Sequence, residues 1–172
     1  MQQLYLTGPH AGDIADSLFN ALNVRPVGYR LTPFSVGGGL RGEALHLLTP
    51  PCAPMDNDVP CRIRLRTGDW TIIPRVLDEI AAPTLLQART LHTPILLSGL
   101  TATMLTCRAF RDAVVQCLKG DSPVIVAASD DAEDILRALT DEGDQLWMPV
   151  PESAEGRAAL LEELIPEAAL RM

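Results

Sequence analysis

The sequence predicts a three-layer α/β fold in which a mainly parallel sheet lies between layers of helices. Short apolar segments alternate with amphipathic ones along most of the 172 residues, and this alternation is typical of a parallel sheet with crossover helices. The segments 95–97 and 124–128 are almost continuously apolar, which indicates strands covered on both faces. A glycine run at 37–39 between two strand-like segments predicts an antiparallel hairpin.

The first part of the chain is predicted to form a strand and a helix. Residues 2–8 are a short apolar strand that we expect in the interior of the sheet. An amphipathic helix is predicted over 13–23, because Ile14, Leu18 and Leu22 recur every four residues and therefore share one face.

The next segments are predicted to add antiparallel structure at one side of the sheet. Residues 27–34 and 43–48 flank the glycine-containing turn at 35–42. The Pro-rich stretch 49–60 is expected to be a surface loop, since it is too short for a domain linker. Residues 61–73 read as one strand with outward-pointing charged residues.

The second half of the chain repeats the strand and helix alternation. Residues 74–92 are predicted to form a helix that is kinked or broken at Pro83. The later elements are a strand at 93–100, a helix at 107–120, a strand at 122–129, a helix at 131–143, a strand at 144–150 and a helix from about Ala154. Gly120 and Gly143 stand where helices commonly end.

Length and charge limit the possible classes of protein. The 172 residues, 47% of them hydrophobic, are expected to form a single domain over 1–172. The net charge of −8 and the lack of a Lys/Arg-rich stretch argue against nucleic acid or an anionic membrane as a partner. Polar residues interrupt the apolar stretch 94–105, and the N-terminus lacks the pattern of a leader. We therefore expect a cytoplasmic protein, and the sequence is compatible with a homo-oligomer.

Cysteine and histidine positions give little support to a metal site. The cysteines are Cys52, Cys61, Cys107 and Cys117, and the histidines are His10, His46 and His92. No cysteine spacing matches that of zinc ligands, and the histidines are far apart. Cys107 and Cys117 are predicted to pack on a helix as small hydrophobic residues. We expect no metal and no cofactor.

Residues 1–16 are arranged like a phosphate-binding P-loop but lack its chemistry. That loop reads G-x-x-x-x-G-K-[ST], in which backbone N–H groups and the lysine hold phosphate and the hydroxyl holds Mg²⁺. Counted from Gly8, the closing positions are Asp13, Ile14 and Ala15, and the only lysine is the distant Lys119. A carboxylate at the start of a helix also repels phosphate.

Asp13 has a structural interpretation as well, because it is predicted to cap the N-terminus of the first helix. The segment nevertheless remains a candidate as a vestigial phosphate loop. Its residues are Gly8, Pro9, His10, Ala11, Gly12 and Asp13.

The whole chain resembles the small P-loop nucleoside triphosphatases known as cancer-related or thermophile-type NTPases. Members begin with a strand and TGPPGVGKTT, and Thr7-Gly8-Pro9 keeps that opening here. Members then carry a hairpin with a glycine turn, which Gly28-Tyr29, Thr32, the run 37–39 and Arg41-Gly42 echo. The resemblance implies a P-loop NTPase-like fold.

A second motif of that family is altered in the same way. LSGLTATML at 97–105, followed by Cys107 and Phe110, resembles the strand that carries the family's metal-facing Asp and catalytic Glu. On this match Ser98 stands at the Asp position and Gly99 at the Glu position. The triplet Asp78-Glu79-Ile80 lies inside a helical pattern and is expected on an exposed helical face.

Loss of both motifs predicts a catalytically inactive pseudo-NTPase that binds or regulates a protein partner or a small ligand. The alternative is a nucleotide-binding protein, or an enzyme of other chemistry that uses the crevice at the carboxyl ends of the strands. Candidate residues for that crevice are His10, Ser98, Ser129, Asp130 and Asp131. Each also has a structural role as a turn, strand-end or N-cap residue. The glycine run 37–39 could form an anion nest, but a hairpin turn explains it equally.

Overall fold

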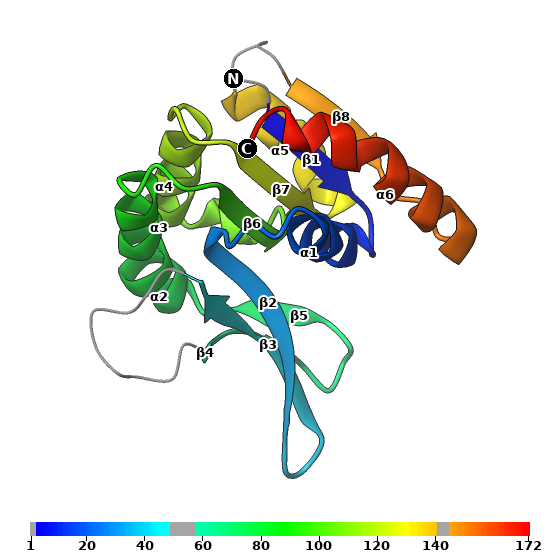
Figure 1. Ribbon diagram of the computed structural model, residues 1–172. Helices are drawn as coiled ribbons and strands as arrows, with labels where there is room; N and C mark the ends of the chain where they lie inside the picture. Colours follow the sequence, from blue (N-terminus) through cyan, green and yellow to red (C-terminus); the bar gives the residue numbers. More distant parts are fainter. Residues whose placement is uncertain (1–2, 49–57, 141–144) are drawn as a thin grey trace.

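The computed structural model describes residues 3–48, 58–140 and 145–172. These residues form an eight-stranded sheet in the order β5-β4-β3-β2-β6-β7-β1-β8 (Figure 1). The strands are β1 (Gln3–Thr7), β2 (Val27–Val36), β3 (Leu40–Leu47), β4 (Asp58–Arg64), β5 (Trp70–Ile72), β6 (Ile95–Leu100), β7 (Val124–Ala128) and β8 (Gln145–Pro149).

The helical segments follow the α/β alternation that the sequence predicts. They are α1 (Ala11–Ala21), α2 (Pro74–Val76), the π-helix η1 (Leu77–Ala81), α3 (Ala82–Arg89), the 3₁₀ turn η2 (Met104–Thr106), α4 (Arg108–Leu118), the 3₁₀ turn η3 (Asp130–Ala132), α5 (Glu133–Leu139) and α6 (Ala154–Ala169). None of the helices in the described ranges is long and apolar enough to cross a membrane.

Five neighbouring strands of the sheet are parallel and the rest are antiparallel. β2, β6, β7, β1 and β8 run in one direction, and β1 lies between β7 and β8. The α/β class, the mainly parallel sheet and the interior position of β1 are thus confirmed. β3, β4 and β5 continue the sheet as antiparallel strands beyond β2. We call β2 to β5 the antiparallel wing.

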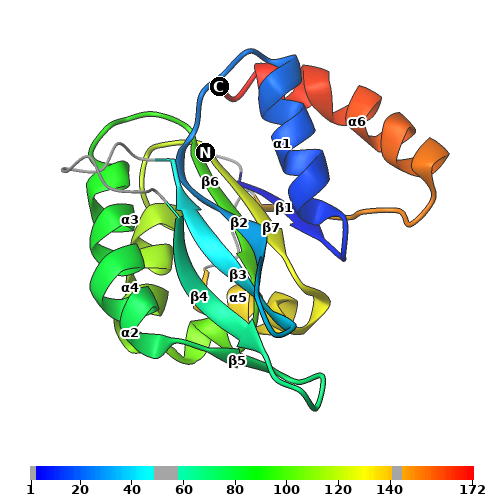
Figure 2. The same cartoon turned by 90° about the horizontal axis from the view of Figure 1, so that it is seen from below.

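Helices cover both faces of the parallel strands, so the molecule has three layers. α1 and α6 lie on one face, and α2, α3 and α4 lie on the other (Figure 2). Side chains alternate along β1 accordingly: Leu4 and Leu6 pack beneath α1 and α6, whereas Tyr5 belongs to the larger core on the opposite face. The runs 95–97 and 124–128, which predicted doubly covered strands, alternate in the same way: Leu96 and Ile125 belong to the core beneath α1 and α6, and Leu97 and Val126 to the other core.

The hairpin between β2 and β3 forms where the glycine run predicts it. The two strands pair from Tyr29↔Leu47 to Val36↔Leu40, with 37–39 as the connecting turn. Gly38 and Gly39 adopt φ angles of +88° and +82°, a region that side chains other than glycine's rarely tolerate. This turn accounts for the glycine run without a ligand.

The prediction of a single strand over 61–73 is wrong. β4 and β5 are two strands joined by a turn, in which the Leu65 N–H donates to the Asp69 carbonyl (2.7 Å). The Thr67 hydroxyl donates to the Asp69 carboxylate (2.9 Å), and Gly68 takes a φ of +94°. Short polar side chains and a left-handed glycine are standard turn chemistry, and they reverse the chain here.

The predicted break at Pro83 takes the form of a π-helical turn. Helical structure continues from Pro74 to Arg89, and the Ala82 N–H bonds to the Leu77 carbonyl immediately before the proline. A proline has no N–H for the helical ladder, so the irregular turn precedes it. Gly120 follows the end of α4 as predicted. Gly143, Cys52 and residues 49–57 of the predicted loop lie outside the described residues.

Candidate ligand-binding cleft

The loop after β1 leads into α1 sooner than the sequence suggests. Gly8 has a φ of +105°, and α1 begins at Ala11 with His10 as its N-cap residue. The prediction that Asp13 is the N-cap is therefore wrong. Asp13 lies within the first turn, its side chain is 81% exposed, and its Oδ2 lies 3.4 Å from His10 Nδ1. The glycine turn starts the helix early because the Ala11 N–H can bond to the Gly8 carbonyl (3.2 Å).

This early start changes which residues of α1 can face a ligand. Ile14 and Ala15 are buried in the core beneath α1, so they do not occupy the positions of a phosphate-binding lysine and hydroxyl. Gly12 faces the strand ends instead, where a Cβ on it would lie 2.9 Å from Ser98 Oγ. Only Pro9 and His10 separate Gly8 from α1, whereas the P-loop pattern has four residues between its glycines.

Ser98 and Gly99 lie on β6 next to this loop. Gly99 forms a bulge, since Ser98 pairs with Ala127 and Leu100 pairs with Ala128. Its φ is +87°, and a Cβ at this position would overlap the Leu31 side chain from β2. The wing thus fills the space that a side chain at position 99 would need.

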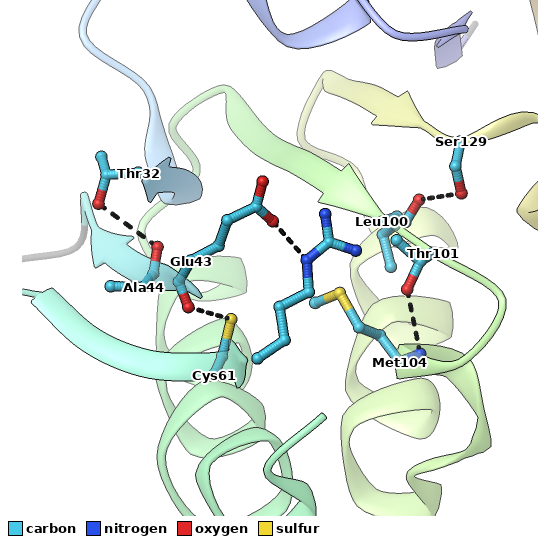
Figure 3. Close-up of polar contacts among 9 residues, drawn as sticks. Thr32, Glu43, Ala44, Cys61, Leu100, Thr101, Met104 and Ser129 are labelled. Carbon is cyan, nitrogen blue, oxygen red and sulfur yellow. Dashed lines mark hydrogen bonds and ion pairs between the residues drawn. The ribbon is translucent and has the colours of Figure 1, made fainter. Parts of the chain in front are cut away.

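Ser129 and the residues after β7 form the opposite wall. The Ser129 hydroxyl donates to the Leu100 carbonyl (3.1 Å) and also contacts the Asp131 carboxylate. Asp131 Oδ1 accepts from the Ala102 N–H (3.4 Å). Ser129 precedes η3 as the sequence suggests, but its hydroxyl does not cap that turn. Figure 3 shows Ser129 beside the end of β6, where Thr101 Oγ1 accepts from the Met104 N–H (3.3 Å).

The wing contributes an ion pair that the sequence analysis missed. Glu43 on β3 and Arg62 on β4 are register partners, and Arg62 Nε donates to the Glu43 carboxylate. Their side chains are only 24% and 18% exposed. The Arg62 guanidinium also lies over the Trp70 ring, 4.6 Å from its centroid. Figure 3 shows Glu43 reaching towards the side where Leu100 and Thr101 lie.

These walls enclose a cleft of about 500 Å³ at the carboxyl ends of β1, β6 and β7. It is lined by Gly8, Pro9, Ala11, Gly12, Asp13, Leu31, Glu43, Arg62, Ser98, Gly99, Leu100, Thr101, Ala127, Ala128, Ser129 and Asp130. A smaller cavity of about 270 Å³ adjoins it and shares Arg62, Thr101 and Ser129. Trp70, Ile72, Thr103 and Asp131 complete that second cavity.

The structure thus brings most of the candidate residues together. Ser98, Ser129 and Asp130 line the cleft, and Asp131 lines the adjoining cavity. His10 is the exception: it stands at the N-cap position of α1, its Nδ1 lies 3.4 Å from Asp13 Oδ2, and it does not line the cleft. Sequence alone could have suggested Arg62 only through the alternation of arginines along β4.

No protein-family model matches the sequence, and no curated protein matches it. A solved structure does resemble it: the crystal structure of THEP1 from the hyperthermophile Aquifex aeolicus superimposes with a TM-score of 0.70. The match covers 97% of this chain and 98% of that chain at 15% sequence identity. The chain has a P-loop NTPase-like fold. At this identity the likeness concerns the fold, and the chemistry of the cleft rests on its own residues.

The cysteines in the described part of the chain are buried in the core. Burial raises the pKa of Cys61 to about 12 and that of Cys117 to about 11, so both remain neutral thiols at pH 7. Cys107 is also buried, with its pKa raised by the same cause. The packing of Cys107 and Cys117 as small hydrophobic residues is confirmed. No group of three or more potential metal ligands occurs among the residues described.

The triplet Asp78-Glu79-Ile80 is helical as predicted, but its first residue is not simply exposed. Asp78 Oδ1 accepts from the Phe110 N–H (3.0 Å) in the first turn of α4. Asp78 therefore caps the N-terminus of α4 from a neighbouring helical segment. Cys107, the residue at the N-cap position of α4, forms no side-chain cap of its own. Glu79 and Ile80 are exposed as expected.

Proposed function

We propose that this protein is a pseudo-NTPase, a non-hydrolytic binding or regulatory module that uses the cleft at the carboxyl ends of its strands. The packing of Leu31 against Gly99 carries the proposal. On the family resemblance, position 99 is where a catalytic glutamate would project, and the leucine occupies that space. Restoring the acid would need the Leu31 side chain to move as well as residue 99 to change.

The loop supports the same function. A triphosphate needs a lysine, backbone donors and an Mg²⁺ ligand at the start of the helix. The cleft-facing residues of that turn are Ala11, Gly12 and Asp13, which provide no cation and no hydroxyl. Asp13 and Asp130 add two carboxylates to the lining, and these repel a polyanion at short range.

An enzyme of other chemistry is less well supported by the geometry. Nucleophilic catalysis needs a hydroxyl or thiol, a base within hydrogen-bond reach and a group that orients the base. In the described ranges no histidine forms a hydrogen bond with Ser98 or Ser129, since His10 contacts Asp13 and His46 contacts Asp58. The Ser129 hydroxyl hydrogen-bonds to the Leu100 carbonyl and the Asp131 carboxylate, which indicates a structural role.

Thermal unfolding with Mg²⁺-ATP or Mg²⁺-GTP tests this function. A dissociation constant of about 10 μM would stabilise the folded state by about 2.7 kcal/mol at about 1 mM nucleotide. That corresponds to a rise in Tm of roughly 5–10 °C for a chain of this size. We expect no Mg²⁺-dependent rise. A saturable Mg²⁺-dependent rise would instead identify a nucleotide-binding protein.

A further inference from the structure

The cleft lining holds one arginine among several carboxylates. Asp13, Glu43 and Asp130 line the cleft, and Arg62, which pairs with Glu43, lies where the cleft meets the adjoining cavity. Register places Arg41 opposite Arg64 and Glu43 opposite Arg62 on neighbouring rows of β3 and β4. Residues two apart on a strand share a face, so Arg41 and Arg64 extend the positive surface outward from Arg62.

The pairing of Arg41 with Arg64 across β3 and β4 does not stabilise the sheet. Like charges directly opposite each other in a sheet are destabilising. Among the described residues neither arginine forms an ion pair, and Arg64 Nε donates only to the Gly68 carbonyl (3.2 Å). The result is an excess of positive charge on the face of the wing that adjoins the cleft, in a chain whose net charge is −8.

Two contacts fix the orientation of the Arg62 side chain. Glu43 fixes its Nε, and Trp70 supports the flat face of the guanidinium. The terminal Nη atoms form no hydrogen bond with any residue in the described ranges, although Arg62 lines both cavities. A guanidinium with two parallel terminal N–H groups matches a carboxylate in geometry. Thr101 Oγ1 lines the same space and accepts from Met104, which leaves its hydroxyl proton available as a donor.

We propose that Arg62 binds a small, singly charged anion, a carboxylate in the simplest case, attached to an uncharged body that lies against Trp70 and Ile72. This inference rests on the proposed binding function and names the ligand class for the same cleft. Single charge follows from Asp131 in the adjoining cavity and from Asp13 and Asp130 in the cleft, which disfavour a dianion. An uncharged apolar body follows from Trp70, which is 42% exposed, and from Ile72 beside it.

Matched probes of one shape and different charge test the proposal. The chain contains two tryptophans, so the two indole N–H signals report separately on Trp70 and Trp147, with Trp70→Phe as the assignment. Titration of the protein with sodium benzoate at constant ionic strength should shift the Trp70 signal to saturation. Benzamide, which is neutral and isosteric, should bind at least tenfold more weakly, and the dianion phenyl phosphate should also bind more weakly.

Variants locate the binding group. Arg62→Gln should abolish the saturable benzoate shift, Arg62→Lys should weaken it, and Arg66→Gln in the exposed β4–β5 turn should leave it unchanged. Preserved amide spectra of both Arg62 variants would show that a lost benzoate shift does not result from unfolding. Equal binding of benzoate and benzamide, or a benzoate shift that persists in Arg62→Gln, would overturn the proposal. These readouts are independent of nucleotide binding, so the inference and the proposed function can fail separately.

Discussion

Leu31 and Gly99 are packed so closely that position 99 has no room for a side chain. Leu31 lies on β2 at the base of the wing, and Gly99 forms the bulge of β6 with a φ of +87°. Two independent constraints therefore require glycine here, one from the backbone conformation and one from the neighbouring leucine. The wing and the parallel strands are joined at this contact.

Gly99→Ala should consequently destabilise the fold by about 2–4 kcal/mol. Alanine at positive φ costs about 1 kcal/mol, and overlap with Leu31 adds about 1–3 kcal/mol. Gly38→Ala is the matched control, because Gly38 has a similar φ of +88° but no atom near its would-be Cβ. Urea unfolding of both variants measures the difference. Equal losses in the two proteins would show that Leu31 does not exclude a side chain at position 99.

Two neighbouring residues of α1 should lose very different amounts of stability when replaced by lysine. Ile14→Lys places a charge in the core beneath α1, where Ile14 is 4% exposed, and we expect a loss of at least about 3 kcal/mol. Asp13→Lys changes an exposed side chain and should cost no more than about 1 kcal/mol through the helix dipole. Chemical unfolding distinguishes them. A stable Ile14→Lys variant would mean that Ile14 faces the cleft after all.

The fold could be predicted largely from apolar periodicity. The doubly covered strands and the α/β alternation follow from which residues must leave water, and the run 37–39 locates the first hairpin. The helix start at Ala11 was missed because Asp13 has the higher capping propensity, whereas the turn at Gly8 and the burial of Ala11 decide the boundary. Tertiary contacts overrode a local preference there.

The cleft was only partly predictable. Ser98, Ser129 and Asp130 follow strands, so the parallel topology brings them to one edge of the sheet. Glu43 and Arg62 meet through the register of β3 against β4, which shifts at a bulge between Glu43 and Ala44. Neither the register nor the bulge has a sequence signal as strong as a glycine run, and the Leu31 contact likewise depends on how the wing packs.

Asp78 should contribute to stability although Glu79 beside it does not. Asp78→Ala removes the acceptor for the Phe110 N–H, and loss of such a cap costs about 1–2 kcal/mol. Glu79→Ala is the control, because its ion pair with Arg75 is exposed and should be worth less than about 0.5 kcal/mol. Thermal unfolding compares them. If both variants unfold at the same temperature, the contact with Phe110 does not stabilise α4.

Buried thiols should make the protein sensitive to alkali. Their ordinary pKa of 9.0 is raised to about 12 for Cys61 and about 11 for Cys117. The folded state therefore keeps protons that the unfolded state releases, so stability falls as pH rises above 9 through these values. Between pH 9 and the raised pKa of each thiol, the free energy of unfolding falls by about 1.4 kcal/mol per pH unit for that thiol.

The double variant Cys61→Ala with Cys117→Ala tests this dependence. Its free energy of unfolding should fall less steeply than that of the unmodified protein between about pH 9 and 11, since the variant lacks both thiols. Urea unfolding at several pH values supplies the comparison, and pH 7 gives the baseline cost of removing the two sulfur atoms. Parallel pH curves for the two proteins would exclude the thiols as the cause.

The absence of triphosphate hydrolysis is the central claim, and a turnover assay tests it most directly. Purified protein is incubated with ATP or GTP and Mg²⁺, and released phosphate is followed against a blank without protein. The occupied space at Gly99 and the missing cation in the loop predict no Mg²⁺-dependent release above the blank. A rate that rises in proportion to protein and disappears in Asp130→Ala would contradict the account, because a carboxylate of this cleft would then be supporting catalysis.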